Sequence, residues 1–520
     1  MKIVIYAAAL LTIGCNSAQQ SSSKSTAGTE GKEAYRVSYA NSITEEELKE
    51  HLFTYASDEF RGRETATEGE RIATDYLRDF YKDQSINPGA GENAYFQKVP
   101  LVMNSVPEGT LTIEGETLEQ GEDFIMFSAV PKSEYELVHA GYGIESSEYS
   151  DYADMDVSGK VVIVYGGEPR KEDGTYLLTG NNTPSDWSNW RETLSDRIEI
   201  ASEKGAAGMI YVDDAYFNRA SGRYKYYQQA DHGGSMQLKK DTDKVALVFM
   251  STEKATEKLA VEAEKPKGDT GKTLSFDLKN TNQELFGNNV VAVIEGSSKP
   301  EEYVILSAHL DHVGINSEGE IHNGADDDGS GTVALLEIAE AFKEAKDAGH
   351  GPERTVVFLH VTGEEKGLFG SEYYTDNPVY PLEQTVANLN VDMIGRIDPK
   401  RDGDRNYVYL IGSDKLSSDL HELSEEVNER FANITLDYKY NAEDDPNRFY
   451  YRSDHYNFAK HNIPIIFYFN GTHDDYHRPS DTPDKINYDL LTNRARLIFH
   501  TAWEVANRPE RPVVDKAVSK

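Results

Sequence analysis

Four short, largely apolar runs in the second half of the chain constrain its fold most strongly. They span residues 304–306, 356–359, 386–391 and 463–469. Each run is consistent with a strand whose two faces are both covered, as in a parallel sheet. Amphipathic helical patterns lie between the runs, so the sequence predicts an α/β layered fold from about residue 274 to residue 507.

An imidazole or a carboxylate follows the end of each run. His309 follows the first run, Glu364 and Glu365 follow the second, Asp392 follows the third, and His477 follows the fourth after a short loop. In open α/β sheets, binding sites lie beyond the carboxyl ends of the strands. A lone histidine in such a place is usually a surface residue. The same pattern at four strand ends instead predicts that these groups share one site.

Two neighbouring segments add to this candidate site. Asp311 lies two residues after His309, where its carboxylate can accept the second ring N–H and fix the tautomer of the imidazole. The acidic run 326–328 precedes a predicted helix over 332–345. An acidic turn or a calcium loop are alternatives for this run, although the other positions of an EF-hand loop are missing. Together these groups can bind two metal ions and leave one carboxylate free, which indicates a hydrolase with a paired metal site.

Composition restricts both the partners and the ligands. The net charge of −37 over 520 residues would repel a phosphate backbone, so nucleic acid is excluded as a partner. A hydrophobic content of 38% is typical of a soluble globular protein. Cys15 is the single cysteine, which excludes intramolecular disulfides and thiolate zinc ligands. Any metal must therefore be held by histidines and carboxylates.

The first residues predict an exported protein. Lys2 precedes an apolar run over residues 3–13, and Gly14-Cys15 follows, which resembles the lipobox of bacterial lipoproteins. We expect a signal peptide over 1–14 and a lipid on Cys15 as the only membrane attachment. The protein would then be an outer-membrane or periplasm-facing lipoprotein. The alternative is an ordinary secretory signal with an incidental cysteine, and a secreted protein.

Changes in composition and in hydrophobic pattern divide the rest of the chain into segments. Residues 15–41, rich in Ser, Thr, Gly and Lys in their first part, predict a flexible tether. Residues 42–131 and 268–510 are predicted to form one catalytic domain in two parts, the second of which carries all metal ligands. Residues 132–267 predict an inserted module without a cluster of metal-binding or nucleophilic residues, and residues 511–520 a tail.

Five motifs resemble those of a known family and occur in its order. They span residues 307–312, 323–331, 362–365, 390–393 and 475–477. They are similar to the motifs of the di-zinc peptidase family that includes secreted bacterial aminopeptidases, aminopeptidase Y and the glutamate carboxypeptidases. The inserted module resembles a protease-associated domain. The resemblance implies an α/β, three-layer, mixed-sheet zinc exopeptidase fold with an inserted, mostly-β protease-associated domain.

The resemblance also implies how two Zn²⁺ ions are held. Asp326 would bridge both ions. Glu365 and His477 would complete one zinc site, and His309 and Asp392 the other. The family further implies a cis peptide bond between Asp326 and Asp327.

Three residues are implied to act beside the metals. Glu364 would be the general base, which takes a proton from the attacking water and delivers it to the leaving amine. Asp311 would contact His309 without binding a metal ion and would orient its ring. Tyr450 stands where related aminopeptidases place a tyrosine that stabilises the oxyanion.

The implied function is an exported di-zinc exopeptidase, most directly an aminopeptidase that removes N-terminal residues from peptides. A dipeptidase of the glutamate carboxypeptidase type is an alternative, for which Arg396, Arg448 or Arg452 could bind the substrate carboxylate. A glutaminyl cyclase fits less well, because such enzymes use one zinc ion. An inactive scaffold that serves as a binding protein is a further alternative, against which the complete ligand set and Glu364 argue.

Overall fold

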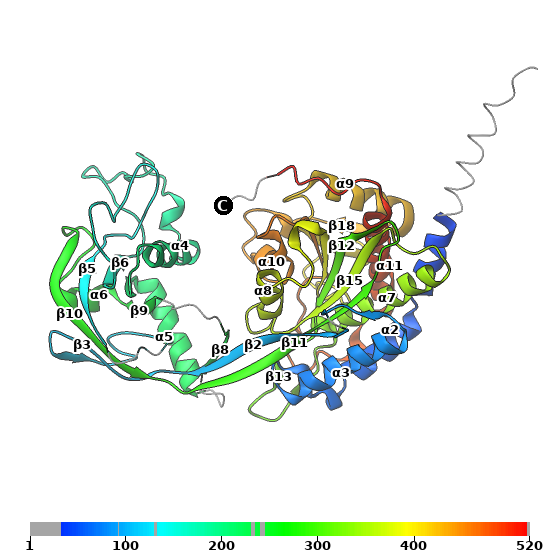
Figure 1. Ribbon diagram of the computed structural model, residues 1–520, viewed down its shortest axis with the longest axis horizontal. Coiled ribbons are helices and arrows are strands. Elements are labelled where there is room, and N and C mark those ends of the chain that lie inside the picture. The colour runs from blue at the N-terminus through cyan, green and yellow to red at the C-terminus, as the bar shows by residue number, and fades with distance from the viewer. Residues whose placement is uncertain are drawn as a thin grey trace, which may run out of the picture. The chain divides into compact units, whose positions relative to one another are not determined.

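A computed structural model of the protein describes most of the chain in two compact units (Figure 1). Unit 1 comprises residues 1–99 and 287–520, and unit 2 comprises residues 100–286. The predicted signal peptide over 1–14 and Cys15 lie outside the described residues. The residues that the structure describes are 33–91, 93–128, 130, 133–229, 234–239 and 245–516.

Unit 1 is built on a mixed sheet whose centre consists of the four predicted strands. The strands β12 (Lys299–His309), β15 (Arg354–Val361), β16 (Thr385–Val391) and β19 (Ile465–Phe469) are parallel to one another. They occur in the order β19-β16-β12-β15. Antiparallel strands flank them, so the sheet is mixed as expected. The other strands of unit 1 are β1 (Asn87–Pro88), β2 (Phe96–Ser105), β11 (Asn282–Ile294), β13 (Gly314–Ile315), β14 (Ile321–His322), β17 (Tyr407–Ile411) and β18 (Thr435–Asp437), of which β2 and β11 continue into unit 2.

Helices cover both faces of this sheet, which gives three layers (Figure 1). Along β12, Val304 and Leu306 belong to one apolar core, whereas Ile305 between them belongs to another. The first core is shared with α2 (Glu45–Tyr55), α3 (Glu68–Asp83), α7 (Gly331–Asp347), α9 (Ser418–Val427) and α11 (Tyr488–Asn507). The second core is shared with α8 (Phe369–Asp376) and α10 (His455–Ala459). Successive side chains of a strand point to opposite faces, so apolar runs of this kind need cover on both sides.

The segment before α2 differs from the prediction. Residues 33–41 were assigned to the flexible tether, but residues 33–42 are helical and belong to unit 1. The buried Arg36 anchors this helix: its Nε donates to His500 Nδ1 at 3.1 Å, and its Nη1 pairs with Glu504 at 2.8 Å. Both partners lie on α11, more than 460 residues away. Because the contacting residues lie so far apart in the sequence, no local sequence pattern predicts this contact.

Unit 2 is larger than the predicted insert of residues 132–267. Its sheet has the strand order β4-β3-β10-β5-β6-β7-β9. The chain enters the unit before β3, because β3 and β4 complete its core: Leu111 pairs with Phe276 of β10, and both are buried. The strands are β3 (Glu108–Ile113), β4 (Glu116–Leu118), β5 (Ser133–His139), β6 (Val161–Tyr165), β7 (Gly208–Val212), β8 (Gly234–Leu238), β9 (Ala246–Met250) and β10 (Gly268–Lys279).

The described part of unit 2 is less purely β than expected. It also holds the helices α4 (Trp190–Glu203), α5 (Asp214–Gln229) and α6 (Thr252–Leu259). The strands β5, β6, β7 and β9 are parallel to one another, and parallel strands require crossover connections. Helix α4 lies in the connection from β6 to β7, and α5 lies in the connection from β7 to β9. Among the described residues of both units, no helix is long and apolar enough to cross a membrane.

Candidate metal centre

The parallel strands of unit 1 bring the predicted side chains to one edge of the sheet. His309 is the last residue of β12, and Asp392 directly follows β16. Glu364 and Glu365 follow β15 within a short turn, and His477 lies in the loop after β19. Because the four strands run in the same direction, their carboxyl ends meet, as the sequence pattern predicts.

One group of ligand-type atoms forms around His309. Its Nε2 lies 3.2 Å from Asp327 Oδ1 and 3.6 Å from Asp392 Oδ1. All three side chains are buried. The other ring nitrogen, Nδ1, donates to the backbone carbonyl of Asp311 at 3.0 Å. This hydrogen bond fixes the tautomer and leaves Nε2 free to bind a cation.

A second group forms around Glu365. His477 Nε2 lies 3.0 Å from both Glu365 Oε2 and Asp327 Oδ2. His312 Nδ1 lies 2.8 Å from Glu365 Oε1 and 3.8 Å from Asp327 Oδ2. The prediction from sequence did not include His312. Its only signal was its place three residues after His309, which does not distinguish it from a surface histidine.

The aspartate shared by the two groups is Asp327, and the prediction of Asp326 as the bridging residue is wrong. Asp327 directs Oδ1 towards His309 and Oδ2 towards His477. The cis peptide bond also lies one position later than expected, between Asp327 and Asp328. Three consecutive aspartates are equivalent in sequence, and only the conformation of the turn decides which of them faces both groups.

Asp326 and Asp481 instead fix the loop that presents Asp327. Asp326 Oδ1 accepts the N–H of Gly395 at 2.7 Å, and its Oδ2 accepts the side-chain amide of Asn470 at 3.1 Å. Asp481 Oδ2 accepts the backbone N–H groups of Asp326 and Asp327 at 2.9 and 3.2 Å. The loop is therefore held from segments far along the chain.

The two groups have the properties of a metal centre. Unpaired buried polar atoms cost about 1–3 kcal/mol each, so they are rare without a ligand. Burial lowers the pKa of His477, but Asp327 and Glu365 outweigh this effect and raise the pKa to about 10, which reflects an excess of negative charge. Nitrogen and oxygen donors without sulfur suit zinc, and manganese or cobalt can substitute. The buried atoms without a hydrogen-bond partner in the described part of the chain include His309 Nε2, His312 Nδ1, Asp327 Oδ2, Glu365 Oε1 and His477 Nε2.

Glu364 lies beside the groups without belonging to either. Burial raises its pKa well above the usual value, and the carboxylates of Glu365 and Asp392 raise it further. Its backbone N–H donates to Asp311 Oδ1 at 3.1 Å. A buried carboxyl group with a raised pKa can accept and return a proton near neutral pH, as a general base requires.

Asp311 contacts His309 differently from the prediction. Its carboxylate was expected to accept the ring N–H, but the backbone carbonyl does so, and the nearest carboxylate oxygen is 3.9 Å from His309 Nδ1. The carboxylate instead accepts from Thr65 Oγ1 at 2.8 Å and from the backbone of Glu364. Asp311 therefore links the position of His309 to that of Glu364.

Arg63 holds together the two loops that carry His309 and Asp327. The side chain is fully buried. Its Nε donates to the carbonyl of Leu310 at 3.1 Å, and its Nη2 donates to the carbonyl of Gly324 at 2.9 Å. Nη1 donates to the carbonyls of Asn323 and Tyr55 at 2.7 and 3.1 Å. A single guanidinium thus satisfies four backbone carbonyls next to the site.

We expect Arg63→Met to lower the free energy of unfolding by about 4 kcal/mol, because several buried carbonyls would lose their donor. The same variant should bind metal more weakly, since both ligand loops would lose a shared anchor. Urea unfolding and zinc content measure the two effects. The control is Arg61→Met, an exposed neighbour, with an expected change within about 0.5 kcal/mol. Equal unfolding midpoints for the two variants would contradict the role of Arg63.

Tyr450 does not join these groups in the described structure. It lies on the short helix Phe449–Tyr451, and its ring packs against His455 and Tyr456 with centroid distances of 5.7 and 5.9 Å. The tyrosine at the site is Tyr476, whose ring stacks on His477 with centroids 3.9 Å apart. Burial and the carboxylate of Asp327 raise the pKa of Tyr476, so its hydroxyl keeps its proton. The sequence did not distinguish the two tyrosines because both lie in polar loops.

A pocket opens onto the first group of ligands. Its floor contains Asp327, Asp392 and Glu364, and among its lining residues Arg452 is the one cation. The Arg452 guanidinium lies 4.9 Å from the centre of the Phe449 ring. The remaining walls are mostly apolar and consist of Met393, Phe449, Phe467, Phe469, Thr472 and Tyr476.

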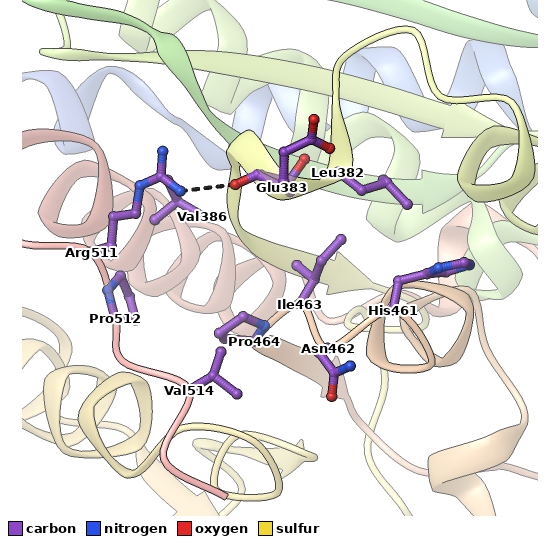
Figure 2. Close-up of a pocket in the computed structure, with 11 residues that line it drawn as sticks. Leu382, Glu383, Val386, His461, Asn462, Ile463, Pro464, Arg511, Pro512 and Val514 are labelled. Atoms are coloured by element: carbon purple, nitrogen blue, oxygen red, sulfur yellow. Dashed lines mark hydrogen bonds between the residues drawn. The ribbon is translucent and has the colours of Figure 1, made fainter. Parts of the chain in front are cut away.

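A second cavity, of about 350 Å³, lies at the opposite edge of the sheet (Figure 2). Its walls include Val386 at the start of β16 and Pro464 just before β19, which are the amino ends of these strands. Arg511 donates to the carbonyl of Glu383 at 3.0 Å across one side of it. Its lining residues contain none of the metal-centre residues, so the carboxyl edge remains the candidate site.

Residues 289–502 match the family described as "Peptidase family M28". A probable leucine aminopeptidase of Arthroderma benhamiae is 30% identical over 225 residues, which are 42% of this chain and 57% of that protein. The aminopeptidase YwaD of Bacillus subtilis is 24% identical over 333 residues, or 62% of this chain and 67% of that protein. A probable glutamate carboxypeptidase of Arabidopsis thaliana is 39% identical over 105 residues, or 20% of this chain and 14% of that protein. The chain thus spans little more than half the length of the fungal relative.

The solved structure of an aminopeptidase from Aneurinibacillus sp. strain AM-1 is similar to the whole described fold. The TM-score is 0.50, the sequence identity is 20%, and the match covers 93% of this chain and 98% of that chain. At this identity the similarity establishes the fold, and the functional argument depends on the residues themselves.

Proposed function

We propose, from the match of residues 289–502 to peptidase family M28, that the protein is a zinc-dependent aminopeptidase that hydrolyses the N-terminal bond of peptides. The observation that carries the proposal is Asp327, which is shared by two groups of ligand-type side chains, while Glu364 beside them belongs to neither group. Two matched relatives are named aminopeptidases, which supports cleavage at the N-terminal end of the peptide substrate.

Two zinc ions are the proposed cofactors. His309, Asp327 and Asp392 would hold the first, and Asp327, Glu365 and His477 the second. When bound, such a pair of ions polarises the substrate carbonyl and makes an attacking water more acidic. The charge balance supports this assignment, because divalent cations would neutralise a buried cluster of carboxylates that otherwise repel one another.

The chain's own residues supply the proton transfers. Glu364 takes the proton of the attacking water and delivers it to the leaving amine, and its raised pKa suits both steps. Asp311 holds the backbone of Glu364 and the ring of His309 in place. In place of Tyr450, Tyr476 donates a hydrogen bond to the substrate oxygen as negative charge develops there.

A specific observation favours a second candidate, a carboxypeptidase of the glutamate type. Such an enzyme needs a cation for the substrate carboxylate. Arg396 is unsuited to this role, because it lies 2.9 Å from Asp475 and 3.8 Å from Asp481. Arg452, by contrast, lines the pocket, and its guanidinium lies 4.9 Å from the centre of the Phe449 ring. The same guanidinium could also recognise a free carboxylate on a short substrate of an aminopeptidase.

A panel of substrates distinguishes these candidates. We expect aminoacyl-coumarins with a free amino group to be cleaved and N-blocked dipeptides to be left intact. A chelator should abolish the activity, because the proposed hydrolysis needs the bound ions, and added Zn²⁺ should restore it. Cleavage of N-blocked dipeptides instead would identify the carboxypeptidase. Activity that survives complete zinc removal would refute both candidates.

A further inference from the structure

His312 is a buried histidine of the metal centre to which neither the sequence nor the proposed mechanism gives a role. Its side chain is fully buried, and it lies in the loop that follows β12. Both ring nitrogens lack a hydrogen-bond partner among the described residues. A buried imidazole is normally satisfied on at least one nitrogen, so a ligand is the missing partner.

The position of His312 matches that of the other ligands around Glu365. Its Nδ1 is 2.8 Å from Glu365 Oε1, yet the two atoms are not aligned for a hydrogen bond. His477 Nε2 has the same relation to Glu365 Oε2 at 3.0 Å. Donor atoms around one tetrahedral zinc lie roughly 3.4 Å apart, given bond lengths of about 2.1 Å. His312, Asp327 and Glu365 form a group of side chains that can hold one metal ion.

The pocket distinguishes the two positions. Its lining includes Asp327 and Asp392 of the first group, together with Glu364. Among the described residues that line it, none is Glu365, His477 or His312. Apart from Asp327, which belongs to both groups, the ligands that line the pocket therefore belong to the first position.

We propose that His312 is the fourth protein ligand of the second metal position. Asp327, Glu365, His477 and His312 would then hold the second ion with four protein ligands, whereas His309, Asp327 and Asp392 would hold the first with three. Four nitrogen and oxygen donors are a usual ligand set for zinc. This inference rests on the proposed function, because it assumes two metal positions.

The test is a titration of metal-free protein with Co²⁺, followed by its visible absorption, whose intensity reports coordination geometry. The wild type should bind two ions, each of which adds visible absorption. In His312→Ala, the affinity of the second position should fall by about 100-fold or more, and the absorption band that the second ion adds should be lost. The exposed His461→Ala serves as the control and should match the wild type.

A third variant separates ligation from simple positioning of Glu365. The side-chain amide of His312→Gln can donate a hydrogen bond to Glu365 but is a poor zinc ligand, and its size protects folding if the alanine variant does not fold. Loss of the band in His312→Gln supports ligation. A wild-type spectrum and affinity in this variant, or in His312→Ala, overturns the inference.

The same data separate the inference from the proposed function. A wild type that binds fewer than two ions contradicts the two-metal proposal itself. A wild type that binds two ions, with variants that do the same at equal affinity, contradicts only the role of His312.

Discussion

Replacement of Glu364 by glutamine is expected to lower kcat by about 10²–10⁴-fold and to leave the zinc content unchanged. The amide has nearly the same shape as the carboxyl group but cannot take a proton from water. Glu364 is outside both ligand groups, so the metals should stay bound. Its backbone contact with Asp311 does not involve the side chain and should persist. Turnover of an aminoacyl-coumarin and zinc analysis of the same sample measure the two quantities.

Two outcomes would contradict this assignment. If the variant lost zinc, Glu364 would be a ligand and not a free base. If kcat stayed within about twofold of the wild type, another group would carry the proton. Glu318→Gln, which changes an exposed glutamate in the same way, is the matched control and should behave as the wild type.

Replacement of Asp327 by asparagine is expected to weaken both metal positions together. Asp327 contributes one oxygen to each group, so a single substitution removes a charged ligand twice. Loss of residues that merely support ligands already costs about 10–100-fold in affinity, and a lost bridging ligand should exceed this at each position. Activity should fall with the metal content. Competition with a zinc indicator gives the two dissociation constants.

Asp326→Asn provides a matched comparison one residue away. This variant should retain both metals, because the Asp326 carboxylate accepts hydrogen bonds from Gly395 and Asn470 and belongs to neither ligand group. It should instead lose about 1–3 kcal/mol of folding stability, since an amide N–H₂ would replace an acceptor oxygen inside a buried network. The reverse result, with metal lost from Asp326→Asn and kept by Asp327→Asn, would restore the original prediction from sequence.

Sequence reasoning predicted those features that follow from the hydrophobic pattern of strands and helices. Short apolar runs mark strands covered on both faces, and the parallel arrangement brings their ends to one edge. This logic is sufficient to bring His309, Glu364, Asp392 and the loop of His477 to one site, because each follows a strand end directly or through one loop. The layered α/β arrangement follows from the same pattern, whereas the mixed sheet was expected from the family resemblance.

The features that it did not predict depend on loop conformation or on distant contacts. Whether Asp326 or Asp327 faces the metal is decided by the turn, which is itself held by Asp481 about 150 residues later. Tyr450 and Tyr476 lie in loops of similar composition, and packing selects between them. The start of unit 2 near residue 100 depends on strand pairing with β10, not on a change in composition.

The order of the segments along the chain also determines at which stage of synthesis the metal centre can form. Strand β19 lies between β16 and β17 in the sheet, and both His477 and Asp481 follow it. A growing polypeptide that ends before residue 477 of 520 therefore lacks a ligand, and one that ends before residue 465 also lacks an inner strand. Under the proposed function, metal uptake would therefore be a late event, and the growing chain would lack hydrolytic capacity until its last segments are made.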